Sequence, residues 1–279
     1  MQTFLNKLLF KRIRRLTAQI RSLPDFMIIG ASKCGTTSLY NYLIQHPYIA
    51  QAFKKEVKFF IFRYERGINY YKSFFPTKIF KWLFKKIYDH NLITGEASPG
   101  YIFHPQVAQK VHALLPNIKI IVMFRNPVDR AYSHYYHGIR KGTEYYSFEK
   151  ALLKEKERIM DEFEKFKKGK ITESRDFRRY SYITRGIYVD QISDWLKYFP
   201  GEQIHIIKSE DFFADPFKYT QKVFKFLNLP TWDEIEYKKY NIGEYKDLEI
   251  SLRNKLIDFY KPFNQKLYDL LNRDFGWEN

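Results

Sequence analysis

The sequence predicts an α/β fold, in which layers of helices flank a central parallel sheet to give a three-layer domain. Short apolar runs alternate along the chain with helical segments, as in parallel α/β proteins. The run IKIIVMF at 118–124 is continuous and rich in β-branched residues, which is typical of a central parallel strand. A glycine-containing turn at 30–35 joins another apolar run to a helix. Ligands of such sheets bind at the carboxyl ends of strands, so the residues after each strand are functional candidates.

The remaining elements follow from apolar patterning and from helix stops. Pro47 and Pro116 are expected to end the helices that precede them. The strands are expected at 25–29, from Leu92 to about Thr94, at 118–124 and after 203. Helices are expected from about 40 to 44, twice within 64–90, at 104–116, after 125, in the charged stretch 143–180, at 215–228 and at 249–272.

Composition limits the classes of partner. The chain has 279 residues, enough for one domain with a substantial core. Its 45% apolar content excludes a disordered chain. A net charge of +17 implies an anionic partner, which charge alone leaves open: a nucleotide, an acidic glycan, nucleic acid or an acidic membrane. Cys34 is the single cysteine, so no internal disulfide forms and nothing argues for secretion.

Residues 1–24 are predicted to form a basic helix ahead of a single domain at 25–279. The segment carries apolar residues at helical spacing, many cations and no acid, which would suit an interfacial helix on an anionic membrane. Its short length and narrow apolar face favour the alternative, a helix packed on the domain. No stretch reaches the length of a membrane span. We expect a cytoplasmic location, with peripheral contact through residues 1–23 at the inner face of a membrane as the open alternative.

The stretch GASKCGTTSL at 30–39 predicts a P-loop-like anion site. Free backbone N–H groups at a helix start point at an anion. Gly30 and Gly35 have the spacing of the nucleotide-triphosphatase loop, but Thr36 follows where that loop has lysine, and the lysine here is Lys33. A P-loop kinase is therefore disfavoured, and no acid at a strand end resembles the magnesium-holding residue of that class.

A second candidate anion site lies in FRNPVDRAYSHYY at 124–136. Arg125 ends a predicted strand and Ser133 lies on the helix that follows, so the two can converge on one anion. The guanidinium fork suits a phosphate, because it binds two oxygens at once. The alternative is a capped helix with a surface ion pair between Arg130 and Asp129 or Glu144.

Together, the two motifs resemble the sulfotransferases that use 3′-phosphoadenylyl sulfate (PAPS). K-x-G-T-T-S-L at 33–39 matches that superfamily's 5′-phosphosulfate loop, and R-x-P-x-x-R-x-x-S at 125–133 matches its 3′-phosphate site. EVKFF at 56–60, EASPGY at 96–101 and the C-terminal FYKPFNQKLYDLLNRDFGW resemble the heparan sulfate (glycosaminoglycan) N- and O-sulfotransferase branch. The single cysteine and the missing signal anchor suggest a bacterial-type member.

The resemblance implies a role for each matching residue. Lys33 would stabilise the leaving oxygen and Glu56 would be the catalytic base. Lys58, Glu96 and Ser98 would contact the acceptor, an anionic or neutral carbohydrate. No metal is implied, and the product would be 3′-phosphoadenosine 5′-phosphate (PAP). The residues expected to bind the donor are Lys33, Cys34, Gly35, Thr36, Thr37, Ser38, Arg125, Ser133, Tyr188 beside the adenine, and Gly243, Tyr245 and Lys246 over the 3′-phosphate.

Several alternatives stay open at this point. Glu56 could instead be a surface acid paired with Lys54, Lys55 or Lys58. Ala97 stands where the branch has lysine, and Lys58 or Lys55 could supply the missing cation. Three histidines near motifs are alternative bases expected to be structural or solvated: His90, His104 and His134. The basic aromatic stretch 54–86, with Arg140, Lys141 and Arg185, would suit a carbohydrate groove. Other functions to weigh are transfer to a small molecule or lipid, nucleotide binding without transfer, and nucleic-acid binding, which the resemblance disfavours.

Overall fold

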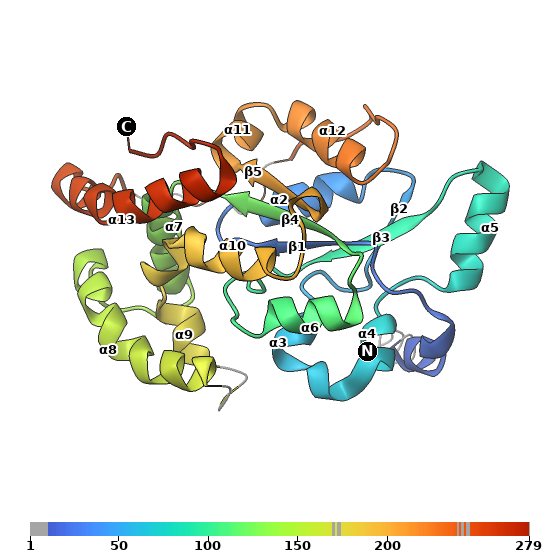
Figure 1. Cartoon of the computed structure of the whole chain (residues 1–279), viewed down its shortest axis with the longest axis horizontal. Helices are drawn as coiled ribbons and strands as arrows, with labels where there is room; N and C mark the ends of the chain where they lie inside the picture. The colour runs from blue at the N-terminus through green and yellow to red at the C-terminus, as the bar shows by residue number, and fades with distance from the viewer. Residues whose placement is uncertain are drawn as a thin grey trace.

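The computed structural model describes residues 11–168, 171, 174–238, 240, 243 and 246–278. Its five-stranded sheet has the order β2-β3-β1-β4-β5 and every strand pair is parallel, which confirms the predicted α/β architecture (Figure 1). The strands are β1 (Phe26–Gly30), β2 (Ile49–Gln51), β3 (Ile93–Ala97), β4 (Lys119–Phe124) and β5 (Ile204–Lys208). The strand order reverses between β1 and β4, and such a switch point is where α/β sheets bind ligands.

Helices cover both faces of this sheet. α2 and α12 pack together on one face, and α6 and α10 cover the other. Beyond the carboxyl ends of the strands, α7, α8, α9 and α13 gather into a helical group. The helices are α2 (Thr36–Leu43), α3 (Phe59–Phe62), α4 (Gly67–Lys72), α5 (Lys78–Tyr88), α6 (Val107–Leu114), α7 (Pro127–Arg140), α8 (Phe148–Lys167), α9 (Arg175–Tyr180), α10 (Tyr188–Leu196), α11 (Ser209–Ala214), α12 (Pro216–Phe226) and α13 (Ile250–Leu271).

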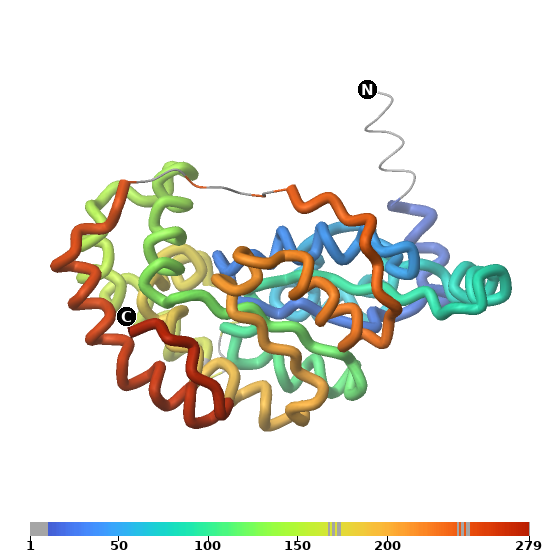
Figure 2. The backbone as a smooth tube through the Cα atoms, turned by 90° about the horizontal axis from the view of Figure 1, so that it is seen from above, coloured from blue at the N-terminus to red at the C-terminus, as the bar shows by residue number. Residues whose placement is uncertain are grey.

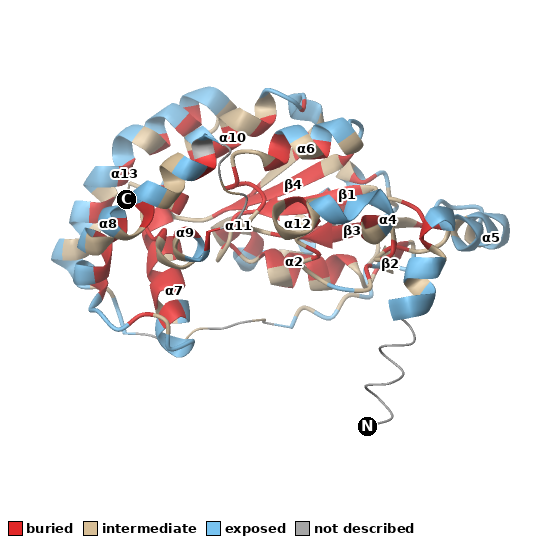
Figure 3. Ribbon diagram, turned by 90° about the horizontal axis from the view of Figure 1, so that it is seen from below, coloured by how far each residue is buried: buried red, intermediate tan, exposed pale blue. Residues whose placement is uncertain are grey.

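The core explains why the central strands are uniformly apolar. All five residues of β1 are buried, and so are the last five of β4, because helices lie on both of their faces (Figure 3). A second cluster joins α7, α8 and α13 through Val128, Phe148 and Tyr260. The helices of this group are therefore held to one another by apolar contacts of their own.

Several elements differ from the sequence prediction: β2 was not predicted, and α2 begins at Thr36 rather than near residue 40. β3 runs to Ala97 rather than ending near Thr94, because Gly95, Glu96 and Ala97 pair with β1. α11 begins at Ser209 directly after β5, ahead of the helix predicted at 215–228. Polar residues in both segments are thus held in regular structure.

The described part of the basic N-terminal segment is attached to the domain. Residues 11–16 are helical and a 3₁₀ turn follows at Ala18–Ile20. Arg14 Nε donates to the carbonyl of Ser73 at 2.7 Å, and Arg21 Nη1 donates to that of Phe75 at 2.8 Å. Residues 1–10 of the predicted helix lie outside the described residues, and Figure 2 shows the described part of this segment at one end of the body. Within the described ranges, no helix is both long and apolar enough to cross a membrane.

Candidate active site

The loop between β1 and α2 brings the start of α2 to the carboxyl edge of the sheet. Lys33 and Gly35 have positive φ values of 74° and 88°. A Cβ on Gly35 would lie 2.8 Å from the ring of Phe213, so glycine is required on both steric and conformational grounds. Thr37, in the first turn of α2, accepts a hydrogen bond of 2.6 Å from Lys55 Nζ. The loop is therefore a strand-to-helix turn of the expected kind, and anion binding at it stays a prediction.

Several side chains of the loop and helix start at 30–38, which we call the donor loop, face inward. Thr36 and Ser38 are buried in α2. Cys34 is buried too, its carbonyl accepts a 2.8 Å hydrogen bond from Ser209 Oγ, and burial raises the pKa of its thiol to about 11. Cys34 is consequently a packing residue of the loop and no nucleophile.

Four cations converge beside this loop. Burial first, and then Arg140, Arg125 and Arg130, lower the pKa of Lys33 to about 8. Arg125 follows β4, and the other two arginines lie on α7, whose start is fixed by Asn126 accepting from the Val128 N–H at 2.9 Å. Cations gathered this closely repel one another unless an anion binds among them.

Arg130 lies beneath this cluster. It is fully buried and donates to the carbonyl of Tyr182, while its Nε and Nη1 have no hydrogen-bond partner among the described residues. The surface ion pair considered for Arg130 is not formed, because Asp129 pairs with Arg253 and Glu144 pairs with Arg158. The sequence motif contains this arginine, but its burial beside the donor loop was not predicted.

His134 and Ser133 lie about one turn further along α7 than Arg130. Ser133 is buried on the helix that begins after Arg125, so the expected pair lies at one end of β4. Burial, and then Arg130, Arg185, Lys33 and His137, hold the pKa of His134 well below its usual value. A neutral, enclosed imidazole is structural, as expected for this histidine.

Tyr188 does not form an open wall for an adenine ring. Its side chain is only 1% exposed and stacks on Phe124 with ring centroids 4.4 Å apart. Its hydroxyl donates to the carbonyl of Arg125 at 2.9 Å. Tyr188 therefore packs in the core against the end of β4, rather than beside an open site.

Glu56 lies within electrostatic reach of the cation cluster. Its backbone N–H donates to the carbonyl of Ala97 at 3.1 Å, and its carboxylate lies 2.8 Å from Lys58 Nζ and 3.9 Å from Lys55 Nζ. Burial, Lys33 and other cations lower the pKa of His137 on α7, and Glu56 opposes that shift. The carboxylate thus lies within electrostatic reach of the same site, while also making the lysine pairs considered as the alternative.

Glu96 and Ser98 lie below the site and cannot touch an acceptor, because both side chains are fully buried. Ser98 Oγ donates to Glu96 Oε2 at 2.6 Å and accepts from the N–H of Lys58 at 3.1 Å. Tyr71 donates to the other carboxylate oxygen at 2.7 Å. This network holds the turn that carries Glu56 and Lys58, which corrects the predicted substrate contact to a supporting one.

The predicted cover over the 3′-phosphate is described only in part. Tyr245 lies outside the described residues, and Gly243 is described without the residues on either side of it. The carbonyl of Lys246 accepts a 2.9 Å hydrogen bond from Tyr132, next to Ser133 on α7. This segment thus contacts the helix of the second motif.

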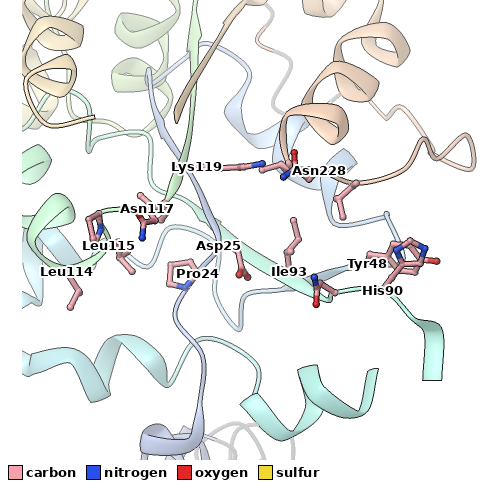
Figure 4. A pocket seen from close by; sticks show the side chains of 15 residues that line it. Pro24, Asp25, Tyr48, His90, Ile93, Leu114, Leu115, Asn117, Lys119 and Asn228 are labelled. Atoms are coloured by element: carbon pink, nitrogen blue, oxygen red, sulfur yellow. The ribbon is translucent and has the colours of Figure 1, made fainter. Parts of the chain in front are cut away.

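Two other regions lie away from the cluster. Arg185 is buried over the ring of Phe103 at 4.3 Å, so it does not line an open carbohydrate groove. A cavity of about 550 Å³ lies at the amino ends of the strands, beside Asp25, Ile93 and Lys119 (Figure 4). This cavity is at the sheet edge opposite the two motifs.

Comparison with known proteins shows the family to which this chain belongs. Residues 23–258 match the sulfotransferase domain family, and the chain belongs to it as a PAPS-dependent sulfotransferase. It is 29% identical to membrane-associated sulfotransferase kil1 of Dictyostelium discoideum, over 92% of this chain and 67% of that protein. It is 28% identical to human heparan sulfate glucosamine 3-O-sulfotransferase 5, over 94% of this chain and 76% of that protein.

A solved structure supports the same assignment. The crystal structure of a sulfotransferase from Alicyclobacillus acidocaldarius aligns with a TM-score of 0.72 and 32% identity, covering 92% of this chain and all of that one. The predicted resemblance to the heparan sulfate branch is confirmed. Among the described residues, no group of three or more His, Cys, Asp or Glu side chains could hold a metal ion.

Proposed function

We propose that this protein transfers the sulfuryl group of PAPS to a hydroxyl or amine of a carbohydrate by in-line displacement. The observation that carries the proposal is the convergence of Lys33, Arg125 and Arg140 at a site whose electrostatic field Glu56 also reaches, since Lys33 and Glu56 both act on His137. An in-line reaction needs both a base and a cation, because a proton leaves the nucleophile as negative charge grows on the leaving group.

The donor's anionic groups fit this arrangement. The 5′-phosphosulfate would lie at the start of α2, against the backbone of Cys34, Gly35 and Thr36, with Thr37 and Ser38 nearby. The 3′-phosphate would pair with Arg125 and Ser133, under a cover supplied by the segment of Gly243, Tyr245 and Lys246. Arg130 adds fixed positive charge from below, where low solvent access strengthens it.

The chemical step then assigns a role to each reacting group. The acceptor oxygen or nitrogen bonds to sulfur as the bond from sulfur to the bridging phosphate oxygen breaks, and PAP leaves with the bonding electrons. The acceptor's proton passes to the Glu56 carboxylate. Lys33 stabilises the charge that develops on the leaving oxygen, an interaction strongest in the transition state.

Lysines next to Glu56 replace the cation that Ala97 lacks. Lys55 Nζ lies within 2.6 Å of Thr37 Oγ1 and 3.9 Å of Glu56, so it connects the donor helix with the base. Lys58 lies 2.8 Å from the same carboxylate. Both would face the transferring sulfuryl group or an acidic acceptor, which supports a carbohydrate over an uncharged lipid or small molecule. A cytoplasmic location, with contact to a membrane through residues 1–23, belongs to the same proposal.

Isothermal titration with PAP tests the donor site directly, using wild type, Arg125→Ala and the matched control Arg12→Ala. We expect micromolar binding by wild type and by the control, and about 100-fold weaker binding by Arg125→Ala, because a charge-assisted phosphate contact is lost. Thermal melting establishes that each variant is folded. Absence of PAP binding by folded wild type, with salt-dependent binding to DNA of any sequence, would overturn the proposal in favour of nucleic-acid binding.

A further inference from the structure

α5 projects from the domain at the end away from the donor loop (Figure 1). Thr77 caps its start by accepting from the Phe80 N–H at 3.1 Å, so the helix is locally well defined. Its contacts with the body are few: Lys81 pairs with Asp25 at 2.8 Å, and Phe84 meets the Tyr48 ring at a centroid distance of 5.9 Å. None of its residues is buried.

The rest of α5 exposes large apolar side chains. Ile79, Leu83 and Ile87 are spaced by four and therefore form one row along the helix. Exposed fractions run from 45% to 71% across Ile79, Phe80, Trp82, Leu83, Ile87 and Tyr88. Contiguous apolar exposure of this kind on a soluble domain marks an interaction surface.

The charge on α5 itself has one sign, and the nearby acids are Asp25, which pairs with Lys81, and Asp89, which caps the end of the helix. α5 contains Lys78, Lys81, Lys85 and Lys86 and no acidic residue. The neighbouring helical segment at 11–16 exposes Lys11, Arg12 and Arg15, and no acid precedes Asp25 in the chain. This segment and the turn after it also expose Ile13, Leu16 and Ile20.

Backbone contacts hold the two segments at one end of the molecule. Arg21 forms an isolated β-bridge with Thr77, the residue that caps α5. Arg14 donates to the carbonyls of Ser73 and Phe75 just before it. Figures 2 and 3 show both segments together at the end of the body opposite the helical group of α7, α8 and α13.

We propose that α5 and residues 11–20, together the α5 surface, dock on an anionic lipid membrane. Bulky apolar side chains enter the region between headgroups and acyl chains, while the surrounding cations meet acidic headgroups. A second copy of this chain is a poorer occupant, since the cations of the surface outnumber the nearby acids Asp25 and Asp89 and would be brought into opposition. The α5 surface is separate from the donor site, so membrane docking does not depend on sulfuryl transfer.

Co-sedimentation of the full chain with vesicles tests the proposal. Vesicles of phosphatidylcholine with 30% phosphatidylglycerol are compared with pure phosphatidylcholine, a composition we choose to give a strongly anionic surface. The variants are Lys85→Gln/Lys86→Gln and Leu83→Ser/Ile87→Ser, with Leu153→Ser/Leu270→Ser as the matched control, since these exposed leucines lie on α8 and α13. PAP binding, measured in parallel, checks that each variant is folded.

We expect binding to the anionic vesicles alone. Loss of two lysines should weaken it about 30-fold and loss of the two apolar side chains about 10-fold, while the control should match wild type. Trp82 fluorescence should shift to the blue with anionic vesicles, and Trp82→Phe should remove the shift. Equal binding to both vesicle types, or unchanged binding by both α5 variants, would overturn the proposal. So would lipid-free dimers that Leu83→Ser/Ile87→Ser disrupts, without vesicle binding.

Discussion

The two ends of the sheet carry the same basic residue types in opposite settings. At the carboxyl edge, Lys33, Arg125 and Arg130 are buried or half-buried and fixed by the donor loop, β4 and α7. At the other end, Lys85 and Lys86 lie on an exposed helix between apolar side chains. Buried charges are screened weakly by water and salt, whereas exposed charges are screened strongly.

This difference teaches how one excess of positive charge can serve two purposes. Held rigidly and away from water, a few cations select one compact anion. Displayed on a helix, cations next to apolar side chains favour an extended anionic surface. The net charge of +17 therefore identifies no partner until the buried and the exposed cations are considered separately.

The substitution Glu56→Gln has the largest expected effect and distinguishes the function of the carboxyl edge from that of the exposed α5. The variant keeps the size of the side chain but cannot accept the acceptor's proton, so transfer from radiolabelled PAPS should fall by about 10²–10⁴-fold. The transfer assay uses the acceptor that a glycan panel identifies. PAP affinity and vesicle binding should stay at wild-type values, as should all three measurements for the exposed control Glu157→Gln. Transfer at the wild-type rate by folded Glu56→Gln would remove this residue from the mechanism.

The pH dependence of donor binding gives the next largest effect. Burial and neighbouring arginines lower the pKa of Lys33 to about 8, so the free protein loses this charge as pH rises through that value. PAP affinity should decline by up to about tenfold for each pH unit above 8. Titrations from pH 7 to 9.5 measure this, and Lys33→Arg should flatten the decline. A wild-type affinity that stays constant to pH 9.5 would contradict the role of Lys33.

A smaller effect is expected from Ser98→Ala beneath the base. The substitution removes a hydrogen bond to the buried Glu96 carboxylate and leaves the Lys58 N–H without that acceptor. The free energy of unfolding, from urea denaturation, should fall by about 1–3 kcal/mol. The exposed control Ser251→Ala should change it by less than about 0.5 kcal/mol. Equal stability of the two variants would show that the network does not support the Glu56 turn.

The sequence was sufficient for four of the five parallel strands and for the positions of the two motifs after β1 and β4, whereas β2 was not predicted. Continuous apolar runs at β1 and β4 indicate buried strands. Gly35 is recognisable from its spacing with Gly30, and in the structure a side chain there would meet Phe213. Such signals are local, since each depends on a few neighbouring residues.

Roles that depend on burial could not be predicted in this way. Glu96, Ser98 and Tyr188 lie in matching segments, yet their side chains point beneath the site because distant tyrosines and β4 enclose them. The basic aromatic stretch 54–86 was interpreted as one groove. It divides in space, with Glu56 and Lys58 beside the donor loop and α5 at the other end of the molecule.

The reactivity of Cys34 can report how often the donor loop opens. It is the chain's single thiol, fully buried and inert at neutral pH because burial raises its pKa to about 11. A disulfide reagent therefore modifies the native protein only when the loop opens. The rate of that one reaction reports loop opening in the unaltered protein, and slower labelling with PAP would measure how firmly the donor holds the loop closed. Because Cys34 does not react while the loop is closed, a cysteine introduced on the surface can be labelled selectively.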